Sequence, residues 1–466
     1  MNSTTVQEKI QRLQEQITAE YPLVRDIVNA LDSSGGRALV VGGAVRDALL
    51  EVPLKDLDIE VHGISLDQLQ KILEKFGHVR LVGKQFGVLR VDGLDVDWSI
   101  PRSDGSGRKP KVIFDPHMSL KEAFRRRDLT MNAMGLDLVT NQLEDPFDGQ
   151  RDLQLRVLKV PDANLFMEDP LRFFRVMQFI GRFQMKPDQE LQEMCKTMDL
   201  SSVSVERIYG EFEKLLLKSS APSWGIKWLQ EIERLKELLP ELHDTIGIEQ
   251  DPHWHPEGDV FEHTMQAVDA AVEEDLQDEA KIILALAALS HDLGKVTTTK
   301  IINGRVRSPG HDVEGVSVAQ ALLSRITNTN EIKETVCKLV RYHMMPGQFV
   351  SNKAGPAAYK RLAKKLAPHT TLDFLAKLAR ADKRGRNPEL KKPLAEQSVV
   401  DIAEFLKRAQ NVRVLYQPEP PLLTGKDLLG IVEPGPKMGK LLQKAYELQI
   451  EEGISNKEEL KIKILK

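Results

Sequence analysis

The stretch VVGGAVRD at residues 40–47, with the DLD triplet at residues 56–58, decides the fold of the first part of this chain. Its glycine pair lies between an apolar, strand-like run and a helix-like run that ends near Leu50. Asp56 and Asp58 then stand two residues apart in a strand-like segment, so their side chains point to one face. Two carboxylates on one face are unfavourable unless a cation neutralises them, and Mg²⁺ ions that hold a nucleoside triphosphate meet this need. The stretch therefore predicts a metal-dependent nucleotidyl transferase.

Composition sets limits on the class of protein. A chain of 466 residues is too long for one core, so we expect several domains, and 41% hydrophobic with 29% charged residues is typical of globular proteins. The two cysteines, Cys195 and Cys337, lie far apart, which argues against a disulfide framework or a cysteine-ligated zinc. With no membrane-length apolar run and no signal-peptide pattern, we expect a cytoplasmic protein without a membrane partner. A formal net charge of −4 argues against a large nucleic-acid footprint but allows a local basic groove.

The pattern of strands and helices predicts an α+β fold, in which a small mixed-sheet head precedes all-helical domains. Helix periodicity dominates after Asp162, and residues 102–116 have the composition of a loop. The candidate strands are residues 38–41, 58–61, 78–82, 87–91, 95–100 and 133–138. The expected domains are a helical lead-in (1–36), a catalytic head (37–150), a helical neck (151–245), a second helical domain (246–390) and a helical tail (391–466) that could contact RNA.

The glycine pair favours phosphate binding. Gly42 and Gly43 allow the backbone to approach a triphosphate closely, and the N-terminus of the helix that follows favours anions. Arg46 adds a bidentate donor for phosphate. Two-metal phosphoryl transfer also needs a further carboxylate from a neighbouring strand. Asp95 and Asp97 share a face, so their spacing leaves both open for this role.

Three motifs follow one another along the first half of the chain. They are GGAVRDALL…KDLDIEV (42–61), RRRDLTMNAM (125–134) and EDPLRFFRVMQFIGRF (168–183). Together they resemble the bacterial-type (class II) tRNA nucleotidyltransferases, the CCA-adding enzymes and their poly(A) polymerase relatives, over about residues 39–217. The resemblance implies that Asp56 and Asp58 bind Mg²⁺, and that Asp97 supplies the third catalytic carboxylate in preference to Asp95.

The resemblance also implies which residues bind the nucleotide. It assigns contacts with the incoming nucleotide to Arg126, Arg127 and Asp128. Asn132 lies four residues after Asp128 and shares its face if the segment is helical.

A helix expected from Glu168 to Arg175 resembles the family's base-selecting element. Asp169, Arg172 and Arg175 are spaced by three and share one face of such a helix. Asp169 would accept from the exocyclic amine of cytosine or adenine, and Arg172 would donate to the neighbouring ring nitrogen. Guanine and uracil would leave these buried groups mismatched. Gln178 stands where the family often carries a third arginine, so a polar contact survives there but a charge does not.

The implied reaction is attack of a tRNA 3′-hydroxyl on the α-phosphate of CTP or ATP. Residues 83–88 lack the basic segment of the poly(A) polymerases, which favours the CCA-adding form. The intact loop at residues 102–116 favours full CCA addition over A-only or CC-only addition. A poly(A) polymerase remains one alternative, and a nucleotide hydrolase with a vestigial transferase head is another.

A second constellation lies in the helical part of the chain. His263, the His291-Asp292 pair in HDLGK, and Asp382 follow the order of the HD phosphohydrolase superfamily, which they resemble. Imidazoles and carboxylates on facing helices make a mixed site for a divalent transition metal such as Ni²⁺, Co²⁺ or Mn²⁺. His311 and His343 are further candidates to widen or line this site. Some family members with such a domain hydrolyse 2′,3′-cyclic phosphates and 2′-nucleotides, and the sequence leaves open whether this copy is active.

Overall fold

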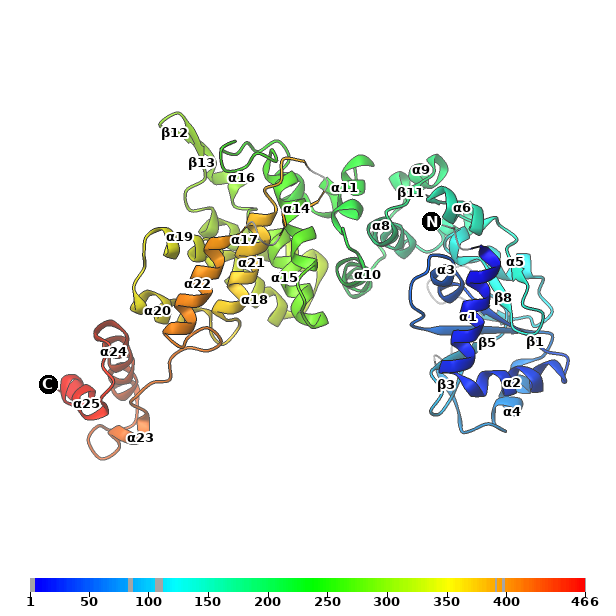
Figure 1. The fold of residues 1–466 in the computed structure, drawn as a ribbon, viewed down its shortest axis with the longest axis horizontal. Coiled ribbons are helices and arrows are strands. Elements are labelled where there is room, and N and C mark those ends of the chain that lie inside the picture. The colour runs from blue at the N-terminus through cyan, green and yellow to red at the C-terminus, as the bar shows by residue number, and fades with distance from the viewer. Residues whose placement is uncertain (1–4, 83–86, 105–111, 390–391, 396–398, 466) are drawn as a thin grey trace. The chain divides into compact units, whose positions relative to one another are not determined.

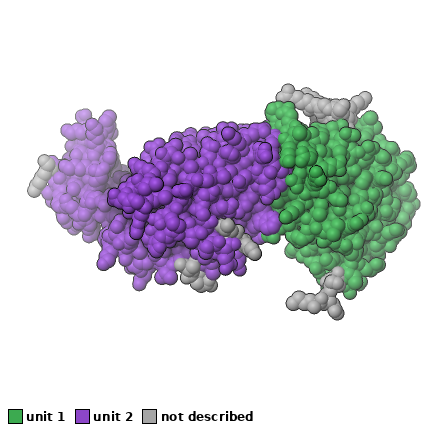
Figure 2. All heavy atoms as spheres, turned by 90° about the horizontal axis from the view of Figure 1, so that it is seen from above, with its two compact units in different colours: residues 1–203 green, residues 204–466 purple. Residues whose placement is uncertain are grey.

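The structure is a computed structural model that describes residues 5–82, 87–104, 112–389, 392–395 and 399–465. The chain divides into two compact units, residues 1–203 and 204–466 (Figure 2). Each unit is described separately below, with the labels of Figure 1.

The first unit is built on a mixed sheet of seven strands. The order across the sheet is β3-β4-β5-β2-β1-β8-β9, and β2 pairs in parallel with β5 while the other neighbours are antiparallel. All six strands expected from the sequence lie in this sheet. The strands are β1 (Arg37–Val41), β2 (Leu57–His62), β3 (Val79–Val82), β4 (Val88–Val91), β5 (Val96–Ser99), β8 (Gly135–Asp137) and β9 (Leu143–Glu144).

Short helices surround this sheet (Figure 1). Helix α1 begins at a capping box of Thr5 and Glu8, and α2 begins with a proline at its first turn. They bury apolar residues such as Ile17 and Leu31. The helical elements are α1 (Val6–Glu20), α2 (Pro22–Asp32), α3 (Gly43–Leu49), α4 (Leu66–Leu73), α5 (Leu120–Arg125) and the 3₁₀ turn η1 (Thr130–Asn132).

Two segments singled out in the sequence lie partly outside the described residues. The ends of the expected loop at residues 102–116 pair as a hairpin of β6 (Arg102–Asp104) and β7 (Val112–Phe114), while residues 105–111 are not described. Of the segment at residues 83–88, only the last two residues are described.

The rest of the first unit is helical, and it corrects one expectation. No single helix runs from Glu168 to Arg175, because α7 ends at Met167 and α8 begins at Leu171 with Pro170 as its N-cap. Asp169 therefore precedes the helix that carries Arg172, and a proline next in sequence disfavours helical geometry at that position. The elements are α6 (Gly149–Leu155), α7 (Ala163–Met167), α8 (Leu171–Phe183), α9 (Gln189–Thr197) and the parallel pair β10 (Val157–Leu158) and β11 (Lys186–Pro187).

The second unit is helical apart from one hairpin. Helices α14 and α15 are apolar on nearly all sides, as expected for helices at the centre of a bundle, and α14 packs against α15 and α21. Strands β12 (Lys300–Ile302) and β13 (Arg305–Arg307) meet at a two-residue turn of Asn303 and Gly304, both with positive φ, and an asparagine–glycine pair is typical of such turns.

The helices of the second unit have the following bounds. They are α10 (Val205–Lys218), α11 (Ser223–Glu231), α12 (Leu235–Leu238), α13 (Pro240–His243), α14 (Val260–Val272), α15 (Asp278–Ser290), α16 (Lys295–Thr298), α17 (His311–Ile326), α18 (Asn330–Tyr342), α19 (Met345–Ser351), α20 (Pro356–Leu366), α21 (Leu372–Arg384), α22 (Val400–Asn411), α23 (Gly425–Leu428), α24 (Pro436–Glu452) and α25 (Lys457–Leu465). The last three share an apolar core of their own, with Leu428 and Leu460 fully buried. None of the helices in the described part of the chain is both long and apolar enough to cross a membrane.

Candidate active sites

The carboxylates of the head meet on two neighbouring strands. Asp58 of β2 stands opposite Asp97 of β5 in their parallel register, so both side chains leave the sheet on one face. Asp56 comes directly before β2. Desolvation raises the pKa of the Asp58 carboxyl; Arg127 opposes this shift, while the negative charges of Asp97 and Asp56 add to it. Neighbouring carboxylates make one another's ionisation unfavourable, and a bound divalent cation offsets this repulsion. These residues therefore fit Mg²⁺.

Arg90 is a member of this site that the sequence did not single out. It leaves β4 beside β5, contacts the carboxylate of Asp97 directly, and lies 3.4 Å from that of Asp95. Among the described residues, the three-ligand groups whose atoms come within 4.8 Å of one another all lie in the second unit. The head carboxylates share one face of the sheet without forming such a close group, and Asp97 is held by Arg90.

A buried glutamate holds Arg126 and Arg127 beside these carboxylates. Glu60, two residues after Asp58 on β2, is fully buried, and its Oε2 lies 3.5 Å from Arg126 and 3.6 Å from Arg127. Burial favours the neutral acid, but His62, Arg127 and Arg126 outweigh it and lower the pKa of Glu60. Glu60 thus adds a fixed negative charge behind Arg127, which the DLD pattern alone does not reveal.

The glycine turn brings Arg127 close to the start of α3. Gly42 has φ of 70°, and a Cβ there would lie 3.3 Å from Nη1 of Arg127. Gly43 begins α3, and a Cβ on it would lie 3.5 Å from Nη2 of Arg46. Gly42 therefore keeps space for the guanidinium of Arg127, whereas a Cβ at Gly43 would make only an ordinary contact with Arg46.

Arg46 is buried and already partnered. Its Nε donates to Asp47 at 2.8 Å, its Nη1 donates to Asn132 at 2.5 Å, and its guanidinium packs on the rings of Phe179 and Phe183. The structure thus places Arg46 as a link between α3, the 3₁₀ turn and α8, with only part of its donor set left for a phosphate.

Asp128 organises the other nucleotide-binding candidates. It accepts from Nε of Arg175 at 2.6 Å and from Nδ2 of Asn132 at 2.8 Å. Burial opposes ionisation of Asp128, but Arg175 and Asn132 prevail and lower its pKa to about 2. From the sequence, Asn132 is expected to lie near Asp128 if this segment forms a helix. The segment forms a 3₁₀ turn instead, and this turn brings Asn132 to Asp128.

The base-selecting candidates surround the start of α8. Arg172 donates to the carbonyls of Leu165 at 2.8 Å and Arg126 at 2.6 Å, which fixes its guanidinium. Asp169 accepts from the amide of Leu171 at 3.2 Å. Gln178 is buried on α8, and its Oε1 has no hydrogen-bond partner among the residues that the structure describes.

The second unit gathers four histidines and two aspartates into one cluster, the HD cluster, from five helices or their ends. Nε2 of His263 lies 3.2 Å from Nε2 of His291, 3.2 Å from Asp382 and 3.6 Å from Oδ2 of Asp292. On the other side, Nε2 of His311 lies 3.1 Å from Nε2 of His343 and 3.3 Å from Oδ1 of Asp292. The two oxygens of Asp292 thus face two separate groups of ligand candidates. With Asp382 beside His263, all six residues that the sequence offered for this site lie together.

The hydrogen bonds of the four rings decide which nitrogen faces the cluster. Each Nδ1 lies 2.7 Å from an oxygen that can only accept, so Nδ1 carries the proton and Nε2 has the lone pair. Opposed lone pairs repel unless a cation lies between them, so the HD cluster fits divalent metal ions. The acceptors are Oε1 of Glu257 for His263 and the carbonyls of Ala288, Ser308 and Val340 for His291, His311 and His343.

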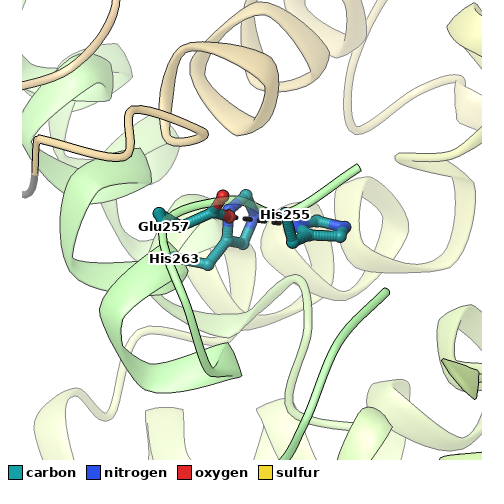
Figure 3. Close-up of side chains that lie close together, drawn as sticks. All are labelled: His255, Glu257 and His263. Carbon is teal, nitrogen blue, oxygen red and sulfur yellow. Dashed lines mark hydrogen bonds and ion pairs between the residues drawn. The ribbon is translucent and has the colours of Figure 1, made fainter. Parts of the chain in front are cut away.

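Glu257 is shared by two histidines (Figure 3). Its Oε1 accepts from Nδ1 of His263 at 2.7 Å and from Nδ1 of His255 at 2.9 Å. Burial opposes ionisation of Glu257, but the bonds from His255 and His263 lower its pKa to about 2. A carboxylate behind a metal-binding imidazole fixes its orientation and raises its basicity. The sequence pattern alone assigns no role to His255 or Glu257.

The HD cluster opens into a cavity of about 520 Å³. Asp292, His311, His343 and Asp382 of the HD cluster line it, together with Trp254, His255 and the residues of β13. Lys295 also lines it and lies 2.6 Å from Oδ2 of Asp292.

Comparison with known families accounts for both sites. The sequence matches the family described as "Poly A polymerase head domain" over residues 38–159 and the HD domain over residues 260–383. It also matches "Probable RNA and SrmB-binding site of polymerase A" over residues 185–246. The fold and the sites therefore define a nucleotidyltransferase that carries an HD domain.

Relatives identify the family within this class. The "Multifunctional CCA protein" of Xanthomonas euvesicatoria pv. vesicatoria is 31% identical over 421 residues, which cover 87% of this chain and 96% of the relative. The chain belongs to this family, which confirms the resemblance seen in the sequence.

Solved structures confirm the expected α+β fold. The CCA-adding enzyme of Bacillus stearothermophilus in complex with CTP is similar with a TM-score of 0.63 at 20% identity, over 93% of both chains. The Thermotoga maritima CCA-adding enzyme complexed with tRNA is similar with a TM-score of 0.59 at 18% identity, over 98% of both chains.

Proposed function

We propose that the head adds CCA to the 3′ end of tRNA from CTP and ATP. The observation that carries the proposal is the register of Asp58 against Asp97, beside Asp56 and Arg127. Membership in the multifunctional CCA protein family supports it, as do similar enzymes solved with CTP and with tRNA. The proposed compartment is the cytoplasm, where these substrates occur.

In the proposed reaction, the oxygen of the tRNA 3′-hydroxyl forms a bond to the α-phosphorus, and the bond from that phosphorus to the bridging oxygen breaks. Pyrophosphate leaves, and Asp97 accepts the proton of the hydroxyl. Asp56 and Asp58 would hold Mg²⁺, which when bound would supply Lewis-acid stabilisation of the phosphate charge. Arg90 contacts the carboxylate of Asp97, and bound cations would supply a competing positive charge at this carboxylate.

Binding of the nucleotide is assigned to residues around Glu60 and Asp128. Arg127, supported by Glu60, faces the triphosphate and sugar next to Gly42 and Gly43. Arg46, Arg175 and the Asp128–Asn132 pair hold this surface in shape. Gln178 is assigned a polar contact with the nucleotide, because its buried Oε1 has no hydrogen-bond partner among the described residues.

Base choice is assigned to Asp169 and Arg172. The two bonds from Arg172 to carbonyls leave three of its N–H groups for a ligand in a fixed geometry, which favours a donor pattern that discriminates between bases. Asp169 supplies the acceptor for the exocyclic amine.

Product sequencing tests the function of the head. Purified protein is incubated with CTP, ATP and tRNA transcripts that lack CCA or lack only the terminal A. Products that end in CCA support the proposal, whereas long A tails made without use of CTP support a poly(A) polymerase. Absence of any incorporation with Mg²⁺ supports a vestigial head.

For the HD domain we propose hydrolysis of nucleotide phosphoesters, with divalent transition metals bound on both sides of Asp292. The observation that carries this is the orientation of four Nε2 atoms toward one cluster. The metal would supply an activated water at neutral pH. Water oxygen bonds to phosphorus, one phosphorus–ribose oxygen bond of a 2′,3′-cyclic phosphate breaks, and the released oxygen takes a proton to leave a monoester. Release of monoester in the presence of Ni²⁺, Co²⁺ or Mn²⁺ tests this, and no release with any divalent metal contradicts it.

The domain division is kept as part of the proposal. Lead-in (1–36), head (37–150), neck (151–245), HD domain (246–390) and tail (391–466) each take one role, and the tail is the part assigned to tRNA contact.

A further inference from the structure

An exposed tryptophan lies at the HD cavity. Trp254 keeps 59% of its surface exposed and lines the cavity together with His255. The turn that carries both is fixed, because their amides donate to the carbonyl of Asp251 at 3.0 and 2.9 Å. The exposed ring of Trp254 lacks the stabilisation that burial gives to an aromatic side chain. A ligand with a planar ring could stack on it and restore that stabilisation.

The β12–β13 hairpin brings two arginines to the same cavity. Arg305 and Arg307 alternate along β13, so their side chains leave on one face, and both line the cavity and are exposed. Neither forms an ion pair with a residue that the structure describes. Lys295 and Arg386 also line the cavity, but they are paired with the carboxylates of the HD cluster at 2.6 and 3.0 Å. Arg305 and Arg307 are therefore the cationic side chains of this cavity that are available to bind an anion.

Resting on the hydrolase function proposed above, the geometry points to a substrate subsite for the 3′ end of an RNA chain. Trp254 stacks on the terminal base, and the terminal phosphate lies at the HD cluster. Arg305 and Arg307 hold the phosphate that joins the terminal nucleotide to its neighbour. The volume of about 520 Å³ is in the range that holds one nucleotide with a flanking phosphate.

The two contacts select for different parts of the substrate. Stacking on Trp254 requires a base, and every base has a ring face, so the subsite accepts any terminal nucleotide. The arginines require a second phosphate, which a cyclic mononucleotide lacks because its single phosphate lies at the HD cluster. An RNA end is therefore the ligand that uses all three features.

The test compares three substrates on full-length protein loaded with Ni²⁺. They are abasic ribose 2′,3′-cyclic phosphate, adenosine 2′,3′-cyclic phosphate and the dinucleotide CpA ending in a 2′,3′-cyclic phosphate. Trp254→Ala should raise KM about tenfold for both base-containing substrates and leave the abasic one unchanged. Trp224→Ala is the matched control, because Trp224 is 40% exposed on α11 and does not line the cavity.

The double variant Arg305→Gln/Arg307→Gln should raise KM about tenfold for the dinucleotide only, and should flatten the salt dependence of that KM. Lys300→Gln, on the same hairpin but outside the cavity lining, is the control.

Three results overturn the subsite. They are equal effects of Trp254→Ala on all substrates, equal effects of the arginine variant on mononucleotide and dinucleotide, and an effect of Lys300→Gln equal to that of the arginine variant.

If wild-type protein hydrolyses none of the substrates, the hydrolase function itself fails. Binding of 5′-fluorescein-labelled dinucleotide, followed by polarisation, still decides the subsite: weaker binding in the Trp254 and arginine variants supports it, and affinity equal to wild type overturns it.

Discussion

Replacing Glu257 by glutamine removes a negative charge from behind His263 with almost no change in side-chain volume. Glu257 is 4% exposed, and one of its oxygens accepts from His263 at 2.7 Å and from His255 at 2.9 Å. An amide oxygen still accepts, but the charge-assisted part of both hydrogen bonds is lost. Loss of such a carboxylate typically lowers metal affinity about 10–100-fold, which equals about 1.4–2.7 kcal/mol. We expect Glu257→Gln to weaken Co²⁺ or Ni²⁺ binding by this factor.

Competition against a chromophoric chelator measures this affinity directly, and the visible spectrum of bound Co²⁺ reports the ligand geometry. His255→Ala is the matched control, because it removes the other donor to Glu257 and leaves the bond to His263 intact. Asp382→Ala removes a ligand candidate and gives the scale of a full loss. Affinity of Glu257→Gln within twofold of wild type would refute the reasoning, and so would an equal loss in His255→Ala.

Four other substitutions test the two sites and the packing between helices. Asp58→Ala should lower CTP and ATP incorporation at least about 100-fold without unfolding the protein, and near-normal incorporation contradicts the metal assignment. Asp169→Ala should relax discrimination against UTP and GTP in four-nucleotide competition, whereas a uniform loss of rate with unchanged selectivity moves base choice elsewhere. Asp292→Ala should abolish cyclic-phosphate hydrolysis and leave CCA addition intact, and loss of both activities contradicts independent sites. Asp269 is buried on α14 and accepts hydrogen bonds from the amide and hydroxyl of Ser223 on α11. Burial raises its pKa to about 7, so the folded protein keeps a proton that the unfolded chain releases, and stability should fall as the pH rises from about 4 to about 7. Asp269→Asn should remove this part of the slope in urea unfolding at each pH, and an unchanged slope contradicts it.

The strands of the head were predictable because each is a short apolar run with local turn signals. The choice between Asp95 and Asp97 was not predictable from spacing, because both alternate onto one face. The parallel register of β5 on β2 places Asp97 opposite Asp58, and this pairing joins residues 39 positions apart (97 minus 58). Register between distant strands depends on the packing of the whole sheet, which local pattern does not contain.

The helix boundary at Asp169 shows a different limit. Spacing by three suggested one helical face, and the proline next to Asp169 was the signal against it. The chain instead ends α7 at Met167 and begins α8 at Leu171, so the acceptor lies in the link between the two helices and the donor lies in the first turn of α8. Their proposed cooperation then depends on the bonds that hold Arg172 to neighbouring carbonyls.

The HD cluster shows why supporting residues are harder to read than ligands. His291, His311 and His343 are each oriented by the carbonyl three residues earlier, a contact that local backbone geometry provides. His263 is different, because it lies inside α14, where the carbonyl of Val260 accepts from the hydroxyl of Thr264. Its Nδ1 needs an acceptor from outside the helix, and Glu257, from the preceding turn, supplies one together with a charge. A histidine ligand in a helix interior therefore implies a separate acceptor, and the acids just before the helix are where a sequence should be searched for it.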